Sequence, residues 1–320
     1  MFFSRFSKFT TVFLFISIFS TFAFSQNNDK KQKNQQKVRT MTIPISIFSK
    51  KELKENQNEE FLQAGDIIVK EDNDQQTILS IRSVTNTPLH IAVLIQDNLS
   101  SNVNLQLNEI KNFIKKLPPE SRVMIGYLRA GTPQITQKFT TDLEKASSSI
   151  RAVVGSSSIA PNSPYEGVEE VLDRFDALPT GRRAILLISD GLDITNTSPT
   201  QSLELDRAIL KAQRRSVAVY SFYYSATLTE GGNSSLILNA QGSLNRISEE
   251  TGGRAYFTGT ISPINFQPFF RDLNLALNRQ FALTYLSTHM KKGYHKIQVS
   301  STNPEVKIEY PKSYYYRGNK

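Results

Sequence analysis

The chain of 320 residues contains no cysteine. This absence excludes disulfide bonds, a thiol nucleophile, a zinc–thiolate site and an N-terminal cysteine that carries a lipid. Hydrophobic residues make up 39 % of the chain and charged residues 21 %, a balance compatible with a packed core. The fold must therefore be stabilised by this core alone.

Histidine is also scarce, because the chain contains only His90, His289 and His295. His90 begins an apolar run, whereas His289 and His295 flank a turn late in the chain. No histidine has a spacing typical of metal ligands or pairs with a serine, and the chain has neither a Gly-x-Ser-x-Gly elbow nor a Walker A loop. We therefore expect that the protein is not an enzyme.

Long apolar runs are limited to residues 1–25. Basic residues precede this run, and Ala23-Phe24-Ser25 matches a signal-peptidase site, so we predict a signal peptide that is cleaved before Gln26. The alternative is an uncleaved membrane anchor, and no other segment is long and apolar enough to span a membrane. Cleavage predicts an exported protein, whose destination is the periplasm, the cell surface or the medium.

The net charge of +9 does not by itself indicate a nucleic-acid site. Part of the excess lies in the polar stretch Asp29–Arg39, and we interpret residues 26–38 as a flexible leader because they contain few apolar residues. Export also makes nucleic acid a poor candidate for a partner.

The middle of the chain alternates between predicted strands and predicted helices. This alternation is typical of an α/β fold with a mainly parallel, doubly wound sheet. Apolar residues at three- and four-residue spacing predict the helices, and short apolar runs predict the strands. The expected helices cover 103–117, 142–154, 164–178, 203–214, 236–251 and a segment around 269–277. The expected strands cover 91–95, 122–128, 135–139, 184–189, 217–223 and 254–257.

The segments before and after this alternating region are predicted to contain strands without helices between them. The expected strands are 41–48, 67–71 and 77–82 before it, and 281–287, 295–300 and 306–310 after it. Antiparallel pairing would bring both flanks into one small β-domain. We therefore expect residues 39–86 and 281–320 to form this β-domain, with residues 87–280 inserted as the α/β domain.

Two of the predicted buried strands end close to an aspartate. Asp97 follows the run Ile91–Ile95, and Asp190 follows the strand in AILLISDGLD (Ala184–Asp193). Open α/β sheets bind ligands at the carboxyl ends of their strands. The two carboxylates are therefore expected to lie at one edge of one sheet.

The segments AILLISDGLD and SEETGGRAYF (Ser248–Phe257), with the placement of Asp97 and Asp190, resemble the von Willebrand factor A domain. The whole mature chain resembles exported bacterial VWFA-related proteins, in which a short β-segment precedes the A domain and a segment like FALTYLSTHMKKGYHKIQVSS (Phe281–Ser301) follows it. The resemblance implies an adhesion or scaffold protein of the cell envelope that binds a protein partner.

The family further implies a metal-ion-dependent adhesion site. There Mg²⁺ takes oxygen ligands from an Asp-x-Ser-x-Ser motif, a threonine in a later loop and a final aspartate. The resemblance places Asp97, Ser101 and Asp190 at the first aspartate, the second serine and the final aspartate. Ser163 or Asn162 occupies the threonine position.

This match is incomplete. Leu99 occupies the place of the first serine and cannot ligate a metal, and Ser163 is also suited to cap the helix that follows it. Two hypotheses therefore stay open: cation-assisted binding of a protein partner, and a metal-free structural or scaffold module in which the motif is a relic. A Mg²⁺-dependent hydrolase is a distant third alternative.

Overall fold

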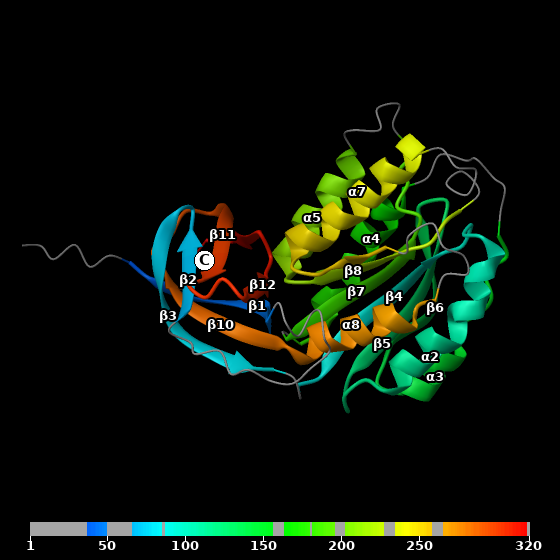
Figure 1. The fold of residues 1–320 in the computed structure, drawn as a ribbon, viewed down its shortest axis with the longest axis horizontal. Helices are drawn as coiled ribbons and strands as arrows, with labels where there is room; N and C mark the ends of the chain where they lie inside the picture. Colours follow the sequence, from blue (N-terminus) through cyan, green and yellow to red (C-terminus); the bar gives the residue numbers. More distant parts are fainter. Residues whose placement is uncertain are drawn as a thin grey trace, which may run out of the picture. The chain divides into compact units, whose positions relative to one another are not determined.

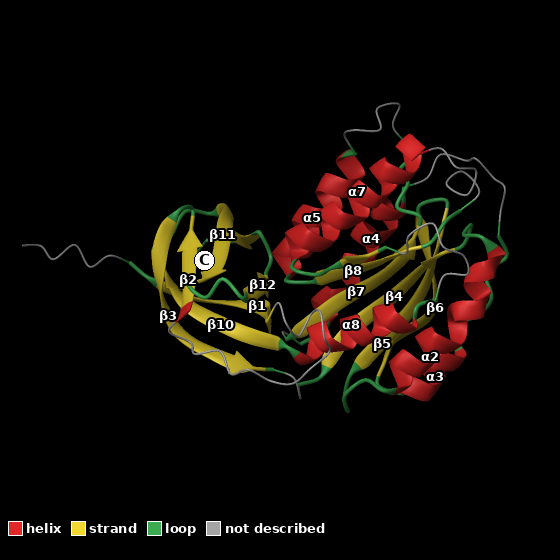
Figure 2. Cartoon of the chain, viewed as in Figure 1, coloured by secondary structure: helices red, strands yellow, loops and turns green. Residues whose placement is uncertain are grey.

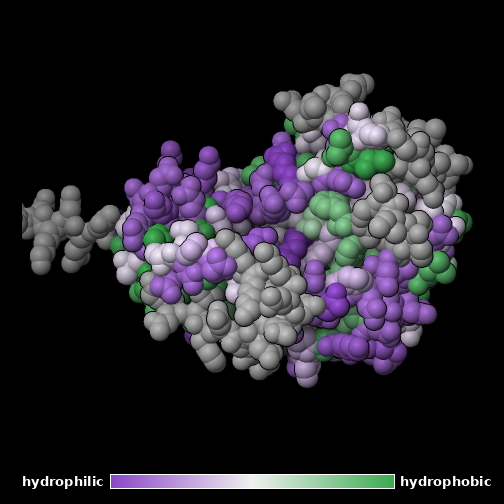
Figure 3. Space-filling model, viewed as in Figure 1, coloured by the Kyte–Doolittle hydropathy of each residue, from purple (hydrophilic) through white to green (hydrophobic). Residues whose placement is uncertain are grey.

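The computed structural model describes residues 37–49, 66–84, 87–155, 163–179, 181–195, 202–226, 234–257 and 265–318. The predicted signal peptide and residues 26–36 of the predicted leader lie outside these ranges. Within them, no helix is both long and apolar enough to cross a bilayer. Hydrophilic residues cover much of the visible face of the described chain, and hydrophobic residues form smaller patches on it (Figure 3).

One sheet contains six strands in the order β6-β5-β4-β7-β8-β9 (Figures 1 and 2). Its strands are β4 (Leu89–Gln96), β5 (Arg122–Arg129), β6 (Thr132–Thr140), β7 (Arg182–Ser189), β8 (Ala218–Tyr223) and β9 (Ala255–Tyr256). All neighbouring strands run parallel except β6, which is antiparallel to β5. The sheet is therefore mixed, and every residue of its inner strand β4 is buried.

Alternate residues of β4 pack into two separate apolar clusters. Ile91 and Val93 pack with helices α2, α3 and α8, whereas Ala92 and Leu94 pack with α4, α5 and α7. These helices are α2 (Leu107–Lys115), α3 (Leu143–Ser148), α4 (Pro164–Leu172), α5 (Leu203–Arg215), α7 (Ser234–Thr251) and α8 (Gln267–Asn278). Helices on both faces explain why β4 is an unbroken apolar run rather than an alternating one. The α/β class predicted from the sequence is confirmed.

A second sheet contains seven strands in the order β12-β1-β10-β3-β2-β11-β13, and all neighbouring strands run antiparallel. Its strands are β1 (Arg39–Ser49), β2 (Ile67–Glu71), β3 (Asp74–Ser83), β10 (Gln280–Ser287), β11 (Gly293–Ser301), β12 (Val306–Glu309) and β13 (Ser313–Tyr316). Strands from before and after the α/β region thus lie side by side in one sheet with its own apolar cluster. The domain boundaries stay a prediction.

The predicted helix at 142–154 is wrong beyond the end of α3. Asn104 makes two hydrogen bonds with the backbone of Val153, at 2.8 and 3.0 Å. The Tyr127 hydroxyl accepts from Arg151 N at 2.8 Å and donates to Arg151 O at 2.7 Å. These side chains come from segments distant in the sequence, and they hold 150–155 in a non-helical conformation despite its local pattern.

Two other predicted helices contain tighter turns than expected. The helix predicted at 103–117 starts as the 3-10 helix η2 (Ser101–Gln106) and continues as α2. The helix predicted at 164–178 ends as α4 and continues as the 3-10 helix η3 (Asp173–Ala177). Such short 3-10 turns are common at the ends of α-helices.

Candidate functional site

The carboxyl ends of β4 and β7 lie next to each other, as expected from the sequence. The two strands pair in parallel, so Asp97 and Asp190 follow the ends of neighbouring strands. The Gln96 side chain joins these ends, because its Oε1 accepts hydrogen bonds from Ser189 Oγ and, at 3.2 Å, from Asp190 N. We call this part of the six-stranded sheet, with Gln96, Asp97, Ser189 and Asp190, the carboxyl edge.

Asp97 is 8 % exposed and is bound by an arginine from the segment after α3. Arg151 Nη1 donates to Asp97 Oδ1 at 2.8 Å and Nη2 donates to Oδ2 at 3.0 Å. The guanidinium lies over the Tyr127 ring, 3.9 Å from its centroid. The pKa of Arg151 is raised, chiefly by its hydrogen bond to Asp97. This bidentate, charge-assisted pair neutralises the carboxylate.

The residues at the predicted serine and threonine positions each have their own surroundings, which differ from those of Asp97. Leu99 is fully buried and forms an isolated bridge with Ala226. Ser101 is exposed at the start of η2. Ser163 is buried as the N-cap of α4, and its Oγ accepts a hydrogen bond from Tyr165 N at 3.3 Å. The alternative ligand, at position 162, lies outside the described residues.

Asp190 is 3 % exposed and lies in a tight turn after β7. Its Oδ1 accepts a hydrogen bond from Leu192 N at 3.1 Å, and Gly191 has a φ of +72°. A Cβ atom at Gly191 would lie 2.6 Å from Ala240 O in α7, so glycine is required there. Burial raises the pKa of Asp190 to about 6, although its hydrogen bonds with Leu192 and Gln96 act in the opposite direction.

We expect Asp190→Asn to remove a pH dependence of stability. The pKa of Asp190 is about 6 in the folded chain, against an ordinary value of 3.8, so between these values the folded state binds more protons than the unfolded state. The stabilisation is present below about pH 4 and is lost as the pH rises through 6, on the order of 1 to 3 kcal/mol in total.

Urea unfolding of both proteins at several pH values measures this effect. The unfolding free energy of Asp190→Asn, relative to the wild type, is expected to rise by that amount between about pH 4 and about pH 7. A difference that stays constant over this range would show that Asp190 is charged in the folded chain throughout.

The predicted ligands do not fit a magnesium ion as the structure places them. Mg²⁺ requires a nearly octahedral set of oxygen ligands. Both oxygens of Asp97 already bind Arg151, and Ser163 Oγ caps a helix. The side chain of Leu99 has no oxygen. Ligation by Asp97, Ser101, Ser163 and Asp190 stays a prediction, and these contacts oppose it.

The sequence did not indicate that Arg151 belongs to this site. It lies 54 residues after Asp97, in a stretch whose pattern predicts a helix. Its position depends on the Tyr127 and Asn104 contacts with the segment after α3. A local pattern contains no signal for contacts of this kind.

No family model and no curated protein matches the chain. Among solved structures, it is similar to an aerotolerance-related membrane protein from Bacteroides fragilis, at 14 % identity and a TM-score of 0.40, over 59 % of this chain and 98 % of that one. It is similar to BatB from Bacteroides thetaiotaomicron, at 13 % identity and a TM-score of 0.42, over 59 % and 97 %. A von Willebrand factor type A structure from Catenulispora acidiphila matches at 9 % identity and a TM-score of 0.45, over 88 % and 73 %.

At such low identity, these similarities concern the fold alone. The structure itself supplies the decisive features of that fold. The six-stranded sheet has one antiparallel edge strand, helices on both faces, and aspartates after the two neighbouring inner strands β4 and β7. The α/β part of the chain is therefore a von Willebrand factor A-like domain, which confirms the resemblance found in the sequence.

Proposed function

We propose that the protein is a non-enzymatic protein-binding module whose partner binds at the carboxyl edge without a resident metal ion. The Arg151–Asp97 pair is the observation that carries this proposal. In it, a side chain of the chain itself supplies the positive charge that an ion would bring to Asp97. The Arg151 side chain is 38 % exposed, so part of it can contact a partner.

Exposed apolar side chains near this pair support the same proposal. Leu105 in η2 is 69 % exposed, and Val154, three residues after Arg151, is 83 % exposed. The hydrogen bonds from Asn104 hold these two segments together. A partly exposed arginine beside apolar groups is typical of the surfaces through which proteins bind one another.

The positions of the histidines argue against hydrolysis at this site. His90 lies at the start of β4, at the end of the strand opposite Asp97. His295 lies in β11, and His289 lies between β10 and β11. No histidine is therefore available at the carboxyl edge to act as a general base. The predicted signal peptide supports a role in the periplasm, at the cell surface or in the medium.

Site-specific cross-linking of the full chain tests this proposal. A photoreactive amino acid at the exposed position Ser101 is expected to capture one polypeptide from an envelope extract of the source organism. Capture is expected to be the same in EDTA and in Mg²⁺, because the site carries its own positive charge. The matched control places the same group at Glu120, which is exposed and precedes β5, at the opposite edge of the sheet.

Each outcome of the cross-linking supports one of the hypotheses or contradicts the proposal. Capture from Ser101 but not from Glu120, unaffected by EDTA, supports the proposal. Capture that requires Mg²⁺ and is lost in Asp190→Ala would support cation-assisted binding instead. Equal capture from both positions, or no capture from either, would contradict binding at the carboxyl edge.

A further inference from the structure

A second group of polar side chains lies in the seven-stranded sheet, away from the carboxyl edge. Asp72 is in the two-residue turn between β2 and β3, where it and Asn73 have φ values of 48° and 76°. Positive φ at both positions is typical of a tight hairpin turn. His289 lies between β10 and β11, and His295 lies in β11. We call Asp72, His289 and His295 the histidine–aspartate cluster.

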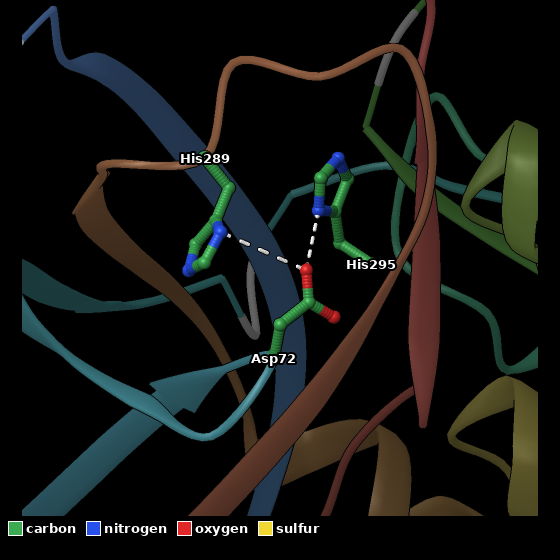
Figure 4. A group of neighbouring side chains, drawn as sticks. All are labelled: Asp72, His289 and His295. Carbon is green, nitrogen blue, oxygen red and sulfur yellow. Dashed lines mark hydrogen bonds and ion pairs between the residues drawn. The ribbon is translucent and has the colours of Figure 1, made fainter.

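The three side chains of the cluster converge on one oxygen atom. Asp72 Oδ2 lies 2.7 Å from His295 Nδ1 and 3.8 Å from His289 Nδ1, and one ligand atom from each residue lies within 4.8 Å of the others. Asp72 Oδ1 accepts a hydrogen bond from Lys296 N at 2.8 Å, which fixes the carboxylate. Figure 4 shows both imidazole rings facing the Asp72 carboxylate.

Both ring nitrogens of His295 lie close to oxygen atoms that accept hydrogen bonds. Its Nε2 lies 2.7 Å from the Lys291 carbonyl oxygen, which only accepts, so Nε2 must carry the hydrogen. Its Nδ1 then faces Asp72 Oδ2 at 2.7 Å and Glu71 Oε1 at 3.5 Å, which are also acceptors when ionised. A hydrogen on Nδ1, or a metal ion that both Nδ1 and Asp72 bind, would match these acceptors.

His289 lies close enough to Asp72 to take part in the same site. Its Nδ1 faces the same Asp72 oxygen, and its Nε2 lies 3.3 Å from Asp74 Oδ2. This Nε2 is buried and makes no hydrogen bond in the described structure. A proton shared by His295 and Asp72 would not involve His289, whereas a metal ion would be bound by all three side chains.

The charges nearby also favour a divalent cation. Glu71, Asp72 and Asp74 lie where β2 ends and β3 begins, and Glu71 is fully buried. Glu71 pairs with Arg39 at 3.5 Å. Among the described residues, Asp72 and Asp74 form ion pairs with the histidines alone. With neutral histidines, these two carboxylates, 37 % and 72 % exposed, would attract a divalent cation to the cluster.

We propose that the histidine–aspartate cluster binds one Zn²⁺ ion through Asp72 Oδ2 and the Nδ1 atoms of His289 and His295. Zinc readily takes two imidazoles together with a carboxylate, whereas magnesium and calcium prefer oxygen ligands and seldom take imidazole. Neighbouring ligands of a tetrahedral zinc lie about 3.4 Å apart, so ion binding would move His295 Nδ1 slightly away from Asp72 Oδ2 and His289 Nδ1 slightly toward it. Three protein ligands leave the fourth position to water or to a donor from a partner.

The far nitrogen of each ring lies near an oxygen of the kind that a zinc-bound histidine uses. Metal-binding histidines commonly donate their other N–H to a carbonyl or a carboxylate, which fixes the tautomer and the ring orientation. The Lys291 carbonyl takes this place for His295, and Asp74 Oδ2 lies 3.3 Å from the far nitrogen of His289, where it could take this place once the ion is bound. The ion would join Asp72 to a histidine 223 residues away in the sequence and thereby stabilise the seven-stranded sheet.

Calorimetric titration of Zn²⁺ into the full chain tests this proposal. We expect one ion to bind, with no competition from millimolar Mg²⁺, and the melting temperature to rise when zinc is bound. His289→Gln and His295→Gln are each expected to weaken binding by more than about tenfold. His90→Gln is the matched control, because His90 is the third histidine and lies in the other sheet. It is expected to bind zinc as the wild type does.

Because His295 is buried, its variant could fail to fold, and a measurement on the wild type keeps the proposal testable. Zinc is expected to shift the ring nitrogen resonances of His289 and His295 while those of His90 stay in place. No saturable binding by the wild type, or zinc binding that His289→Gln leaves unchanged, overturns the proposal. In that case the occupant is a proton shared by His295 and Asp72.

Discussion

Gly253→Ala is expected to destabilise the protein by about 3 kcal/mol or more. A Cβ atom at this position would lie 2.0 Å from Val219 O and 2.7 Å from Val219 C. Backbone atoms cannot move aside as a flexible side chain can, so β8 and the turn after α7 would have to separate. Gly253 N also donates to Ser248 O at 2.8 Å, which fixes this turn against the end of the helix.

The matched control is the same substitution within α7. Gly242 is exposed, and a Cβ atom there would meet no atom within 4 Å. Gly242→Ala is therefore expected to stabilise the protein by about 0.5 to 1 kcal/mol, because alanine is the better helix former. Urea unfolding compares the two variants. Equal effects of the two substitutions would show that the close approach at Gly253 is absent.

Phe222→Ala is expected to cost about 3 to 5 kcal/mol of stability. Phe222 in β8 is fully buried. Its ring centroid lies 5.1 Å from that of Tyr256, 5.2 Å from those of Phe266 and Phe269, and 5.0 Å from that of Phe270. Removing this ring leaves a cavity and ends all four edge-to-face contacts at once.

Phe257→Ala is the control for this second prediction, because Phe257 is 36 % exposed and its ring centroid lies 6.4 Å from that of Tyr223. It is expected to cost about 1 kcal/mol or less. Thermal and urea unfolding measure both variants. A loss at Phe222 no larger than that at Phe257 would mean that the aromatic cluster is loosely packed.

Local patterns predicted the parts of the fold whose causes are themselves local. The unbroken apolar run of β4 predicted a buried strand, and Ser163 as a capping residue predicted the start of α4. The early end of α3 could not be predicted in this way. Asn104 and Tyr127 hold the following segment from other elements, and these contacts exist only in the folded chain.

The same distinction applies to the two sites. Asp97 and Asp190 could be placed at one edge because parallel strands present their carboxyl ends together. The arginine that binds Asp97 could not, since its position results from tertiary contacts. The histidine–aspartate cluster was also missed, because its members come from a hairpin turn and from strands far along the chain.

The pairing of early with late strands in the seven-stranded sheet has a consequence for biosynthesis. β1 pairs with β10, for example Ile43 with Leu283, a separation of roughly 240 residues. At about 5 to 20 residues per second, translation would leave β1 without its partner for on the order of tens of seconds. During that time β2 and β3 can form only an isolated hairpin, which is marginally stable in water. The nascent chain therefore exposes unpaired, apolar strands long before the sheet can close, and a chaperone that holds β1 to β3 would raise the yield of folded protein.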